Sequence, residues 1–269
     1  MNRHTHVKQA NGQQRAYVGT ELQQTNRNNG TKKIGLKMIN KIKLVTATIV
    51  LTFLTACGGG GGGVSVPVPS TESFNLKTVW ANTLTTSSSN TYTISGTING
   101  VAVSGSGTVT RGNLIAGTFE GLPAQQRTTT ATGSLVGNGV TVPLNTSSID
   151  WVDSNYLPKG ESGGEDYVVV TGTPTIPTTA RINDTGTLYT ANRYFSSTKA
   201  VLRGTSRATY VVEADTSSTA LVTLIIEEKN TSNVTTSTSS AQFRITTAGA
   251  FTRIKETIVE GASTLTITY

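Results

Sequence analysis

The sequence has few of the side chains on which most enzymes depend. Its 269 residues contain one cysteine, Cys57, and two histidines, His4 and His6, both of which precede that cysteine. A single cysteine cannot form an internal disulfide framework. After His6 the chain has no histidine to act as the base of a Ser-His-Asp hydrolase or to bind zinc or haem. We therefore expect no cofactor, no bound metal and no catalytic residues of these types.

Positive charge is also scarce in most of the chain. The formal net charge is +7, but nine of the 22 Lys and Arg residues precede Cys57, where Glu21 is the single acidic residue. The remaining 213 residues carry 13 basic and 14 acidic side chains. A strongly basic protein can bind nucleic acid or an anionic surface. This near-neutral body gives no such indication, and we expect no nucleic-acid partner.

Long apolar runs are missing, with one short exception. Residues 44–56 form an uncharged stretch of 13 residues that follows Lys41 and Lys43 and ends at Cys57. A membrane-spanning helix needs about 20 apolar residues, so this stretch is too short to cross a bilayer. A positive flank followed by a short apolar region is typical of a secretory signal peptide.

The end of this apolar stretch, Leu54-Thr55-Ala56-Cys57, resembles the lipobox of bacterial lipoproteins. The resemblance implies that signal peptidase II recognises Leu54, Thr55 and Ala56 and cleaves before Cys57. It also implies that the Cys57 sulfur receives a diacylglyceryl group and that the new amino group is acylated, for example with palmitate. Two or three acyl chains anchor a protein firmly to a membrane. The competing interpretation of a lone cysteine is a buried core residue.

The resemblance also implies a location. In the enterobacterial family an Asp directly after the lipidated cysteine favours retention in the inner membrane, whereas this chain has Gly58 there. We therefore expect a lipid-anchored protein of the outer membrane of a Gram-negative bacterium, facing the periplasm or the exterior. The six glycines from Gly58 to Gly63 suit a flexible tether, because they have the least restricted backbone.

Composition divides the chain into four segments. We expect residues 1–37 to be an untranslated or disordered extension and residues 38–56 to be the signal peptide. Residues 57–72 would then hold the lipidated cysteine and the linker. Residues 73–269 would form the folded body.

The body is rich in Thr, Ser, Val, Ile and Gly, and apolar residues alternate with polar ones without sustained helical periodicity. This pattern predicts an all-β fold. Short turns favour an antiparallel meander, which has to close into a barrel or stack as a sandwich to bury its apolar face. The sequence leaves both possibilities open. Besides one hairpin described next, strands are predicted at residues 75–81, 115–120, 127–135, 140–144, 166–172, 186–190, 200–204, 207–215, 220–229, 241–246, 251–259 and 263–269.

The clearest local signal is Asn99-Gly100. This pair favours a type I′ turn, because both central residues of that turn need positive φ. With these residues as the turn, Ile94 would face Gly105 and Tyr92 would face Gly107. A large side chain opposite glycine can cover the bare backbone, which points to a structural role for the hairpin.

Residues 150–166 interrupt the strand rhythm. Their sequence, DWVDSNYLPKGESGGED, combines acidic residues with glycines and predicts a long loop. We expect this loop to divide the body into two β lobes, residues 73–149 and 165–269, with two separate domains as the alternative. Residues 160–164 match the G-x-S-x-G pattern, but without a histidine base they are better interpreted as a flexible loop.

Several carboxylates are neighbours in the sequence. Two carboxylates can hydrolyse a glycosidic bond without histidine, although solvated charges at strand ends are a simpler interpretation. The neighbouring acids are Asp150 and Asp153; Glu161, Glu165 and Asp166; Glu213 and Asp215; and Glu227 and Glu228.

Taken together, these patterns favour a cell-envelope lipoprotein that is a non-catalytic binding or structural module. Residues 179–194 and the strands predicted after them also resemble envelope lipoproteins of unknown activity. A carboxylate-dependent enzyme acting on envelope polysaccharide and a carrier of hydrophobic ligands are the alternatives. The expected partner is the membrane, through Cys57, and the sequence does not distinguish among a protein, a glycan and an apolar ligand as a further partner.

Overall fold

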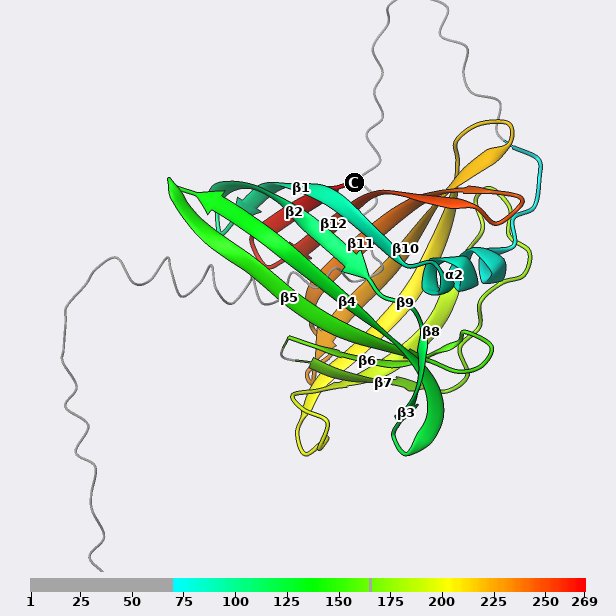
Figure 1. Ribbon diagram of the computed structural model, residues 1–269, viewed down its shortest axis with the longest axis horizontal. Coiled ribbons are helices and arrows are strands. Elements are labelled where there is room, and N and C mark those ends of the chain that lie inside the picture. Colours follow the sequence, from blue (N-terminus) through cyan, green and yellow to red (C-terminus); the bar gives the residue numbers. More distant parts are fainter. Residues whose placement is uncertain (1–69, 165) are drawn as a thin grey trace, which may run out of the picture.

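The computed structural model describes residues 70–164 and 166–269 (Figure 1). The predicted signal peptide, the predicted lipobox at residues 54–57 and nearly all of the predicted linker lie outside the described residues. Strands make up 67% of the structure, beside one short helix, which confirms the predicted all-β class. Its elements are α2 (Leu76–Thr85), β1 (Ser88–Ile98), β2 (Val101–Arg111), β3 (Ile115–Phe119), β4 (Leu122–Gly137), β5 (Val140–Val152), β6 (Pro158–Gly163), β7 (Asp166–Thr171), β8 (Thr185–Tyr194), β9 (Leu202–Ala214), β10 (Thr219–Asn230), β11 (Thr235–Thr246), β12 (Phe251–Glu260) and β13 (Ser263–Thr268).

The strands form one antiparallel sheet that closes on itself. From β4 to β13 each strand pairs with the next in sequence, β13 then pairs with β1, and β1 pairs with β2. The pairing of β2 with β4 completes a closed barrel of twelve strands. Strand β3 lies outside this circle and pairs with the beginning of β4. Of the two predicted architectures, the barrel is therefore the observed one, and closure leaves its twelve strands without a free edge.

The hairpin of β1 and β2 has the predicted register. Ile94 lies opposite Gly105 and Tyr92 opposite Gly107, and the turn residues Asn99 and Gly100 have φ values of 50° and 81°. The Tyr92 ring covers Gly107 so closely that an added Cβ would lie 2.5 Å from the Tyr92 hydroxyl oxygen. A side chain at this position would therefore displace the ring or the strand.

Two apolar clusters fill much of the barrel. The glycine-side core is built on β1, β2, β4, β5, β12 and β13, and the helix-side core lies between α2 and β8 to β11. The glycine-side core contains Tyr92, Ile94, Ile98, Val109, Ala131, Leu135, Leu144, Ile258, Leu265 and Ile267. The helix-side core contains Phe74, Leu76, Val79, Ile176, Ala180, Leu188, Ala208, Tyr210, Val212, Ala220, Val222, Leu224, Ile226, Ala241, Phe243 and Ile245.

The helix α2 corrects the strand predicted at residues 75–81. Asn75 caps it, with its side-chain oxygen accepting a hydrogen bond from the Thr78 amide at 3.0 Å. Leu76, Val79 and Leu84 are buried along one side. This spacing is helical, but it extends over ten residues rich in threonine, and packing against the helix-side core rather than propensity stabilises the helix.

The predicted loop over residues 150–166 is also wrong. Strand β5 continues to Val152, and β6 occupies Pro158–Gly163. Glycine is usual in loops, yet Gly160 lies in the strand β6. The Phe119 ring packs against Gly160 so closely that an added Cβ would come within 2.2 Å of a ring carbon, so this position requires glycine. The segments 200–204 and 207–215, predicted as two strands, lie for the most part in the single strand β9, Leu202–Ala214.

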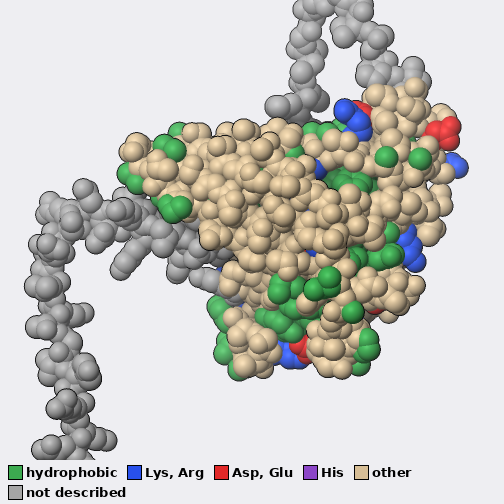
Figure 2. Space-filling view, viewed as in Figure 1, with side chains coloured by type: hydrophobic (Ala, Val, Ile, Leu, Met, Phe, Trp, Pro, Cys, Tyr) green, Lys and Arg blue, Asp and Glu red, His purple; other side chains and the backbone are tan. Residues whose placement is uncertain are grey.

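The outer surface carries few charges on the face shown in Figure 2, where uncharged polar side chains and backbone dominate. Hydrophobic side chains gather at the turn between β4 and β5, where Val136 and Val140 are exposed (Figure 2). Within residues 70–164 and 166–269, no helix has the length and apolar character needed to span a bilayer.

Candidate binding site in the barrel interior

Charged side chains lie inside the barrel, at the boundary between the two apolar cores. Strand β12 begins with Phe251, which packs against the helix-side core. Arg253 and Glu256 come next, and Ile258 then belongs to the glycine-side core. Arg111 follows Val109 on the inward face of β2, and Arg127 precedes Ala131 on that of β4. The alternation that directs apolar residues inward also directs Arg111, Arg127 and Glu256 inward, whereas Arg253 lies at a register shift between β11 and β12.

Glu256 is held by two partners. Its Oε2 accepts hydrogen bonds from Arg253 Nη1 at 3.0 Å and from the Tyr269 hydroxyl at 3.1 Å. Arg253 Nη1 also donates to the Tyr269 hydroxyl oxygen at 3.2 Å, and its guanidinium lies 5.1 Å from the ring centroids of both Phe243 and Tyr269. Arg253 is thus fixed by an ion pair and by two aromatic rings.

Burial strongly perturbs the acid–base behaviour of this group. Glu256 is 0% exposed, and burial raises its pKa to about 7, although Arg253, Arg111 and the Tyr269 hydroxyl act in the opposite direction. Burial likewise lowers the pKa of Arg111 to about 10, and the neighbouring charge of Arg253 contributes in the same direction. Both shifts reflect the cost of placing a charge in a poorly solvated interior.

Arg127 joins the helix to the barrel wall. It is 3% exposed, its Nη2 lies 3.1 Å from Asp150 Oδ2, and its Nη1 donates to the main-chain oxygen of Thr83 in the last turn of α2. A cation beside the carbonyls at a helix C-terminus is favourable, because those carbonyls lack partners within the helix.

A hollow of about 380 Å³ opens beside these arginines, and we call it the rim hollow. It lies between the end of α2, the first residues of β1 and β12, and the ends of β2 and β13. The lining includes three arginines and three aromatic rings but no acidic residue. The lining residues are Thr83, Thr86, Ser88, Asn90, Thr91, Arg111, Arg127, Phe243, Phe251, Thr252, Arg253 and Tyr269.

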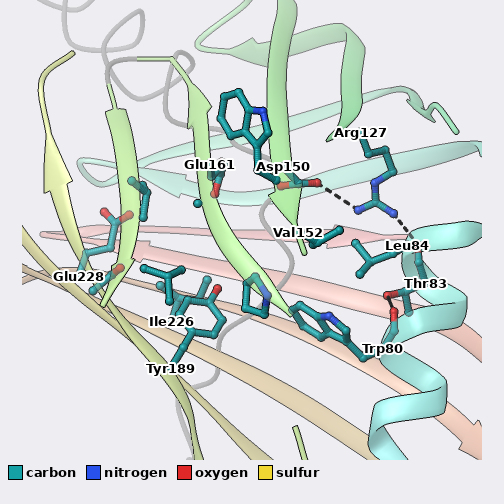
Figure 3. A pocket seen from close by; sticks show the side chains of 16 residues that line it. Trp80, Thr83, Leu84, Arg127, Asp150, Val152, Glu161, Tyr189, Ile226 and Glu228 are labelled. Atoms are coloured by element: carbon teal, nitrogen blue, oxygen red, sulfur yellow. Dashed lines mark hydrogen bonds and ion pairs between the residues drawn. The ribbon is translucent and has the colours of Figure 1, made fainter. Parts of the chain in front are cut away.

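A second hollow, the lumen hollow, lies deeper and has a volume of about 70 Å³ (Figure 3). Asp150 and Glu161 are direct neighbours on β5 and β6, and both line this space together with Glu228. Figure 3 shows Asp150 directed toward Arg127, while Tyr189 lies on the opposite side of the space. Burial, together with the charges of Glu161 and Asp150, raises the pKa of the Tyr189 hydroxyl above its usual range.

Another charged group, at the β7 and β8 side of the interior, has as many carboxylates as guanidinium groups. Arg193 Nη2 lies 2.9 Å from Asp166 Oδ2 and 2.8 Å from Glu228 Oε2, and Arg203 Nη1 lies 2.8 Å from Asp166 Oδ1. Two guanidinium groups thus face two carboxylates. We call these four residues the balanced cluster.

Several of the carboxylates that are neighbours in the sequence bind other residues and do not form the two-carboxylate pair of a glycosidase. Asp153 accepts hydrogen bonds from the amides of Asn155 and Leu157. Asp215 is paired with Arg244 through two contacts of 2.6 and 3.1 Å. Glu213 accepts hydrogen bonds from Thr223 and Gln242, and Glu227 from Thr235.

The G-x-S-x-G pattern does not form a nucleophile elbow. Residues 160–163 lie in β6, which pairs with β7 in a hairpin, whereas the elbow requires a turn from a strand into a helix. Across residues 70–164 and 166–269, no three His, Cys, Asp or Glu side chains are grouped so that they could hold a metal ion.

Sequence reasoning missed the arginines and aromatic rings of the rim hollow. One signal was available: Arg111 and Arg127 occupy inward positions of alternating strands, where an apolar residue is expected. An ionisable residue at such a position is costly and calls for a partner or a function.

Comparison with known proteins adds no relative. No protein-family model, no curated protein and no solved structure matches the chain.

Proposed function

We propose that the chain is a lipid-anchored, non-catalytic binding protein of the bacterial cell envelope and that the rim hollow is its ligand site. The observation that carries the binding role is the lining of this hollow. Its 380 Å³ are bordered by Arg111, Arg127, Arg253 and aromatic rings, a combination of apolar walls and a few convergent polar groups that is typical of small-molecule sites. No carboxylate, histidine or cysteine lines it, so it lacks an acid–base or nucleophilic pair.

The alternative of a carboxylate-dependent enzyme has weaker support. Asp150 and Glu161 do face the same space, but the lumen hollow holds about 70 Å³, well below the roughly 300 Å³ at which ligand pockets begin. Asp150 is also engaged by Arg127. A polysaccharide has no room between these two carboxylates.

The alternative of a hydrophobic-ligand carrier is also less favoured. Buried side chains make up both apolar cores, and the apolar hollow beside α2 holds about 30 Å³. The larger space is the one that carries three guanidinium groups. A purely apolar ligand would offer no acceptor to the N–H groups of Arg111 and Arg127 that lack partners among the described residues, which is unfavourable.

The anchoring part of the proposal depends on the lipobox Leu54-Thr55-Ala56-Cys57. Metabolic labelling with palmitate, followed by membrane fractionation, tests it with the wild type and the Cys57→Ser variant. We expect label and membrane association in the wild type and neither in the variant. Unlabelled wild type in the soluble fraction would contradict the anchor and the envelope location inferred from it.

The binding part is tested by filling the hollow. The full chain is purified in mild detergent and analysed by native mass spectrometry for small molecules that copurify with it. Asn90→Trp places an indole in the rim hollow, whereas Ser89→Trp places it on the opposite face of β1, where Ser89 contacts Thr110. We expect Asn90→Trp to lose the copurifying molecule and Ser89→Trp to retain it. Equal retention by both variants would exclude the rim hollow as the site.

A further inference from the structure

We propose that the rim hollow binds a small carboxylate that bears an aromatic or apolar group, with Arg111 and Arg127 receiving the carboxylate. This inference rests on the proposed function and specifies the chemical class of the ligand.

The first observation is an incompletely paired guanidinium. Arg111 is 8% exposed, and its Nη2 has no hydrogen-bond partner among the described residues. It lines the rim hollow, and its guanidinium lies 6.0 Å from the Tyr269 ring centroid. A buried donor without a partner costs free energy, and an anion that binds the Arg111 guanidinium from the hollow would offset that cost.

The second observation is that Arg127 has the same incompleteness. Two of its nitrogens are engaged by Asp150 and by the end of α2, but Nε has no partner among the described residues. Arg127 is 3% exposed and lines the same hollow. The paired strands β2 and β4 thus each bring an incompletely paired arginine to one space.

The third observation is the electrostatic asymmetry of the surroundings. Arg111, Arg127 and Arg253 face the carboxylates of Asp150 and Glu256, and neither carboxylate lines the hollow. Glu256 is the buried group whose proton affinity is raised, and in its protonated form it offsets still less of the positive charge. A bound monoanion would restore the balance in a region of low dielectric constant.

The aromatic walls indicate what the anion is attached to. Phe243, Phe251 and Tyr269 line the hollow beside the arginines, and the Phe243 and Phe251 rings are in edge contact with centroids 6.3 Å apart. A bare inorganic ion would leave these rings uncovered. A ligand with a planar or aliphatic body would bury apolar surface against them.

The experiment compares matched probes on the full chain in detergent. Benzoate and benzamide have nearly the same shape and differ in charge, and inorganic phosphate is an anion without an apolar group. Binding is measured by saturation-transfer NMR and by titration. We expect benzoate to bind at least tenfold more tightly than benzamide and than inorganic phosphate.

Variants locate the site. Arg111→Met keeps the length of the side chain but removes its N–H donors, and we expect it to weaken benzoate binding at least tenfold. Arg181→Met removes an exposed arginine outside the hollow and should leave benzoate binding unchanged. Arg111→Lys, which retains the charge without the planar group, should bind with intermediate affinity.

A folding defect is detected independently, because each variant is also examined by thermal unfolding. A merely structural Arg111 would lower the melting temperature on substitution and leave the preference for benzoate over benzamide intact in the folded fraction. That result, or equal binding of benzoate and benzamide, would overturn the inference. Phosphate binding as tight as benzoate binding would overturn its aromatic part.

The outcome also separates this inference from the proposed function. If a neutral molecule copurifies and is lost in Asn90→Trp, the binding function stands and the carboxylate specificity is wrong. If no molecule copurifies and neither probe binds, both the binding function and its specificity are wrong.

Discussion

Two groups of charged side chains lie inside the same barrel, and they differ in how completely they are paired. In the balanced cluster, Arg193 contacts both Asp166 and Glu228, and Arg203 completes the pairing of Asp166. At the rim hollow, by contrast, Arg111, Arg127 and Arg253 face two carboxylates, and Arg111 Nη2 has no partner among the described residues. A single Nε lacks a partner in both groups, on Arg193 and on Arg127, so the ratio of guanidinium groups to carboxylates is what distinguishes them.

The difference separates a structural role from a binding role. A buried ion pair with good geometry compensates much of its desolvation cost, and removing one partner leaves an uncompensated charge. The balanced cluster fits this description and connects β7, β8, β9 and β10. An incompletely paired cation in a hollow is destabilising by itself, and such strain is typical of sites where stability is given up for binding.

The largest expected effect is the loss of the balanced cluster. Arg193→Met leaves Asp166 and Glu228 close together in the interior with Arg203 as their remaining guanidinium. We expect the free energy of unfolding to fall by about 3–5 kcal/mol. Chemical denaturation measures it, with the exposed Arg181→Met as a control that should change stability by less than about 0.5 kcal/mol. A loss as small as the control's would remove the structural role of this cluster.

The second effect is the pH dependence caused by Glu256. Its pKa is about 7 in the folded protein against 4.5 in the unfolded chain, so the folded state holds the proton more tightly. The resulting stabilisation is fully present below pH 4.5 and is lost as the pH rises toward 7, by an amount of about 3 kcal/mol. Glu256→Gln mimics the protonated form and should lack this loss.

The measurement for Glu256 is a pair of denaturation curves at pH 5 and pH 8. The two proteins should be closest in stability at pH 5, and the advantage of the Gln variant should grow toward pH 8. Parallel pH profiles would mean that Glu256 titrates normally despite its burial. Because protonated Glu256 offsets less of the positive charge, benzoate binding to the wild type should also be tighter at pH 6 than at pH 8.

The third effect has the opposite sign to the first. Arg111→Met removes a buried, incompletely paired cation, and we expect the ligand-free protein to become more stable by about 1 kcal/mol. The loss of the contact with the Tyr269 ring reduces this gain. Thermal and chemical unfolding of the wild type and the variant test it side by side with Arg193→Met. If both substitutions destabilise equally, the distinction between the two clusters fails.

The smallest effect is expected for an ion pair that is accessible to water, which serves as the reference for the buried groups. Lys199 forms an ion pair with Glu120, which also accepts a hydrogen bond from the Tyr167 hydroxyl at 2.6 Å. These contacts hold the pKa of Glu120 below its usual value, but the pair is accessible to water. We expect Lys199→Met to reduce stability by less than about 0.5 kcal/mol in physiological salt. A loss of several kcal/mol would show that pairing matters as much at the surface as inside.

The parts of the fold that depend on neighbouring residues were predictable. The alternation of apolar and polar residues predicted the all-β class. Asn99-Gly100 predicted the register of the first hairpin, including Tyr92 opposite Gly107. The helix α2 was missed because ten threonine-rich residues carry a weak periodic signal and owe their conformation to packing. Strand β6 was missed because its glycines are typical of loops, although Gly160 makes room for Phe119.

The lipobox at Leu54 to Cys57 stays a prediction from local sequence. The rim hollow could not be predicted in this way. Sequence alternation places Arg111 and Arg127 on inward faces, but it does not say which other strands lie across from them. Arg253, moreover, lies at a register shift between β11 and β12, where simple alternation no longer gives the direction of a side chain.

The sequence by itself determined the strand-forming character of the body, the turn and register of its first hairpin, and the lack of histidine and cysteine in residues 73–269. Tertiary structure alone decided that β2 pairs with β4 to close a barrel, that a helix fills part of it, and that three arginines from three strands surround one hollow. The physical reason is distance along the chain. A turn or an alternating pattern involves residues a few positions apart, whereas closure and the meeting of Arg111, Arg127 and Arg253 depend on the register of all twelve strands, in which a shift of one residue would turn each inward side chain outward.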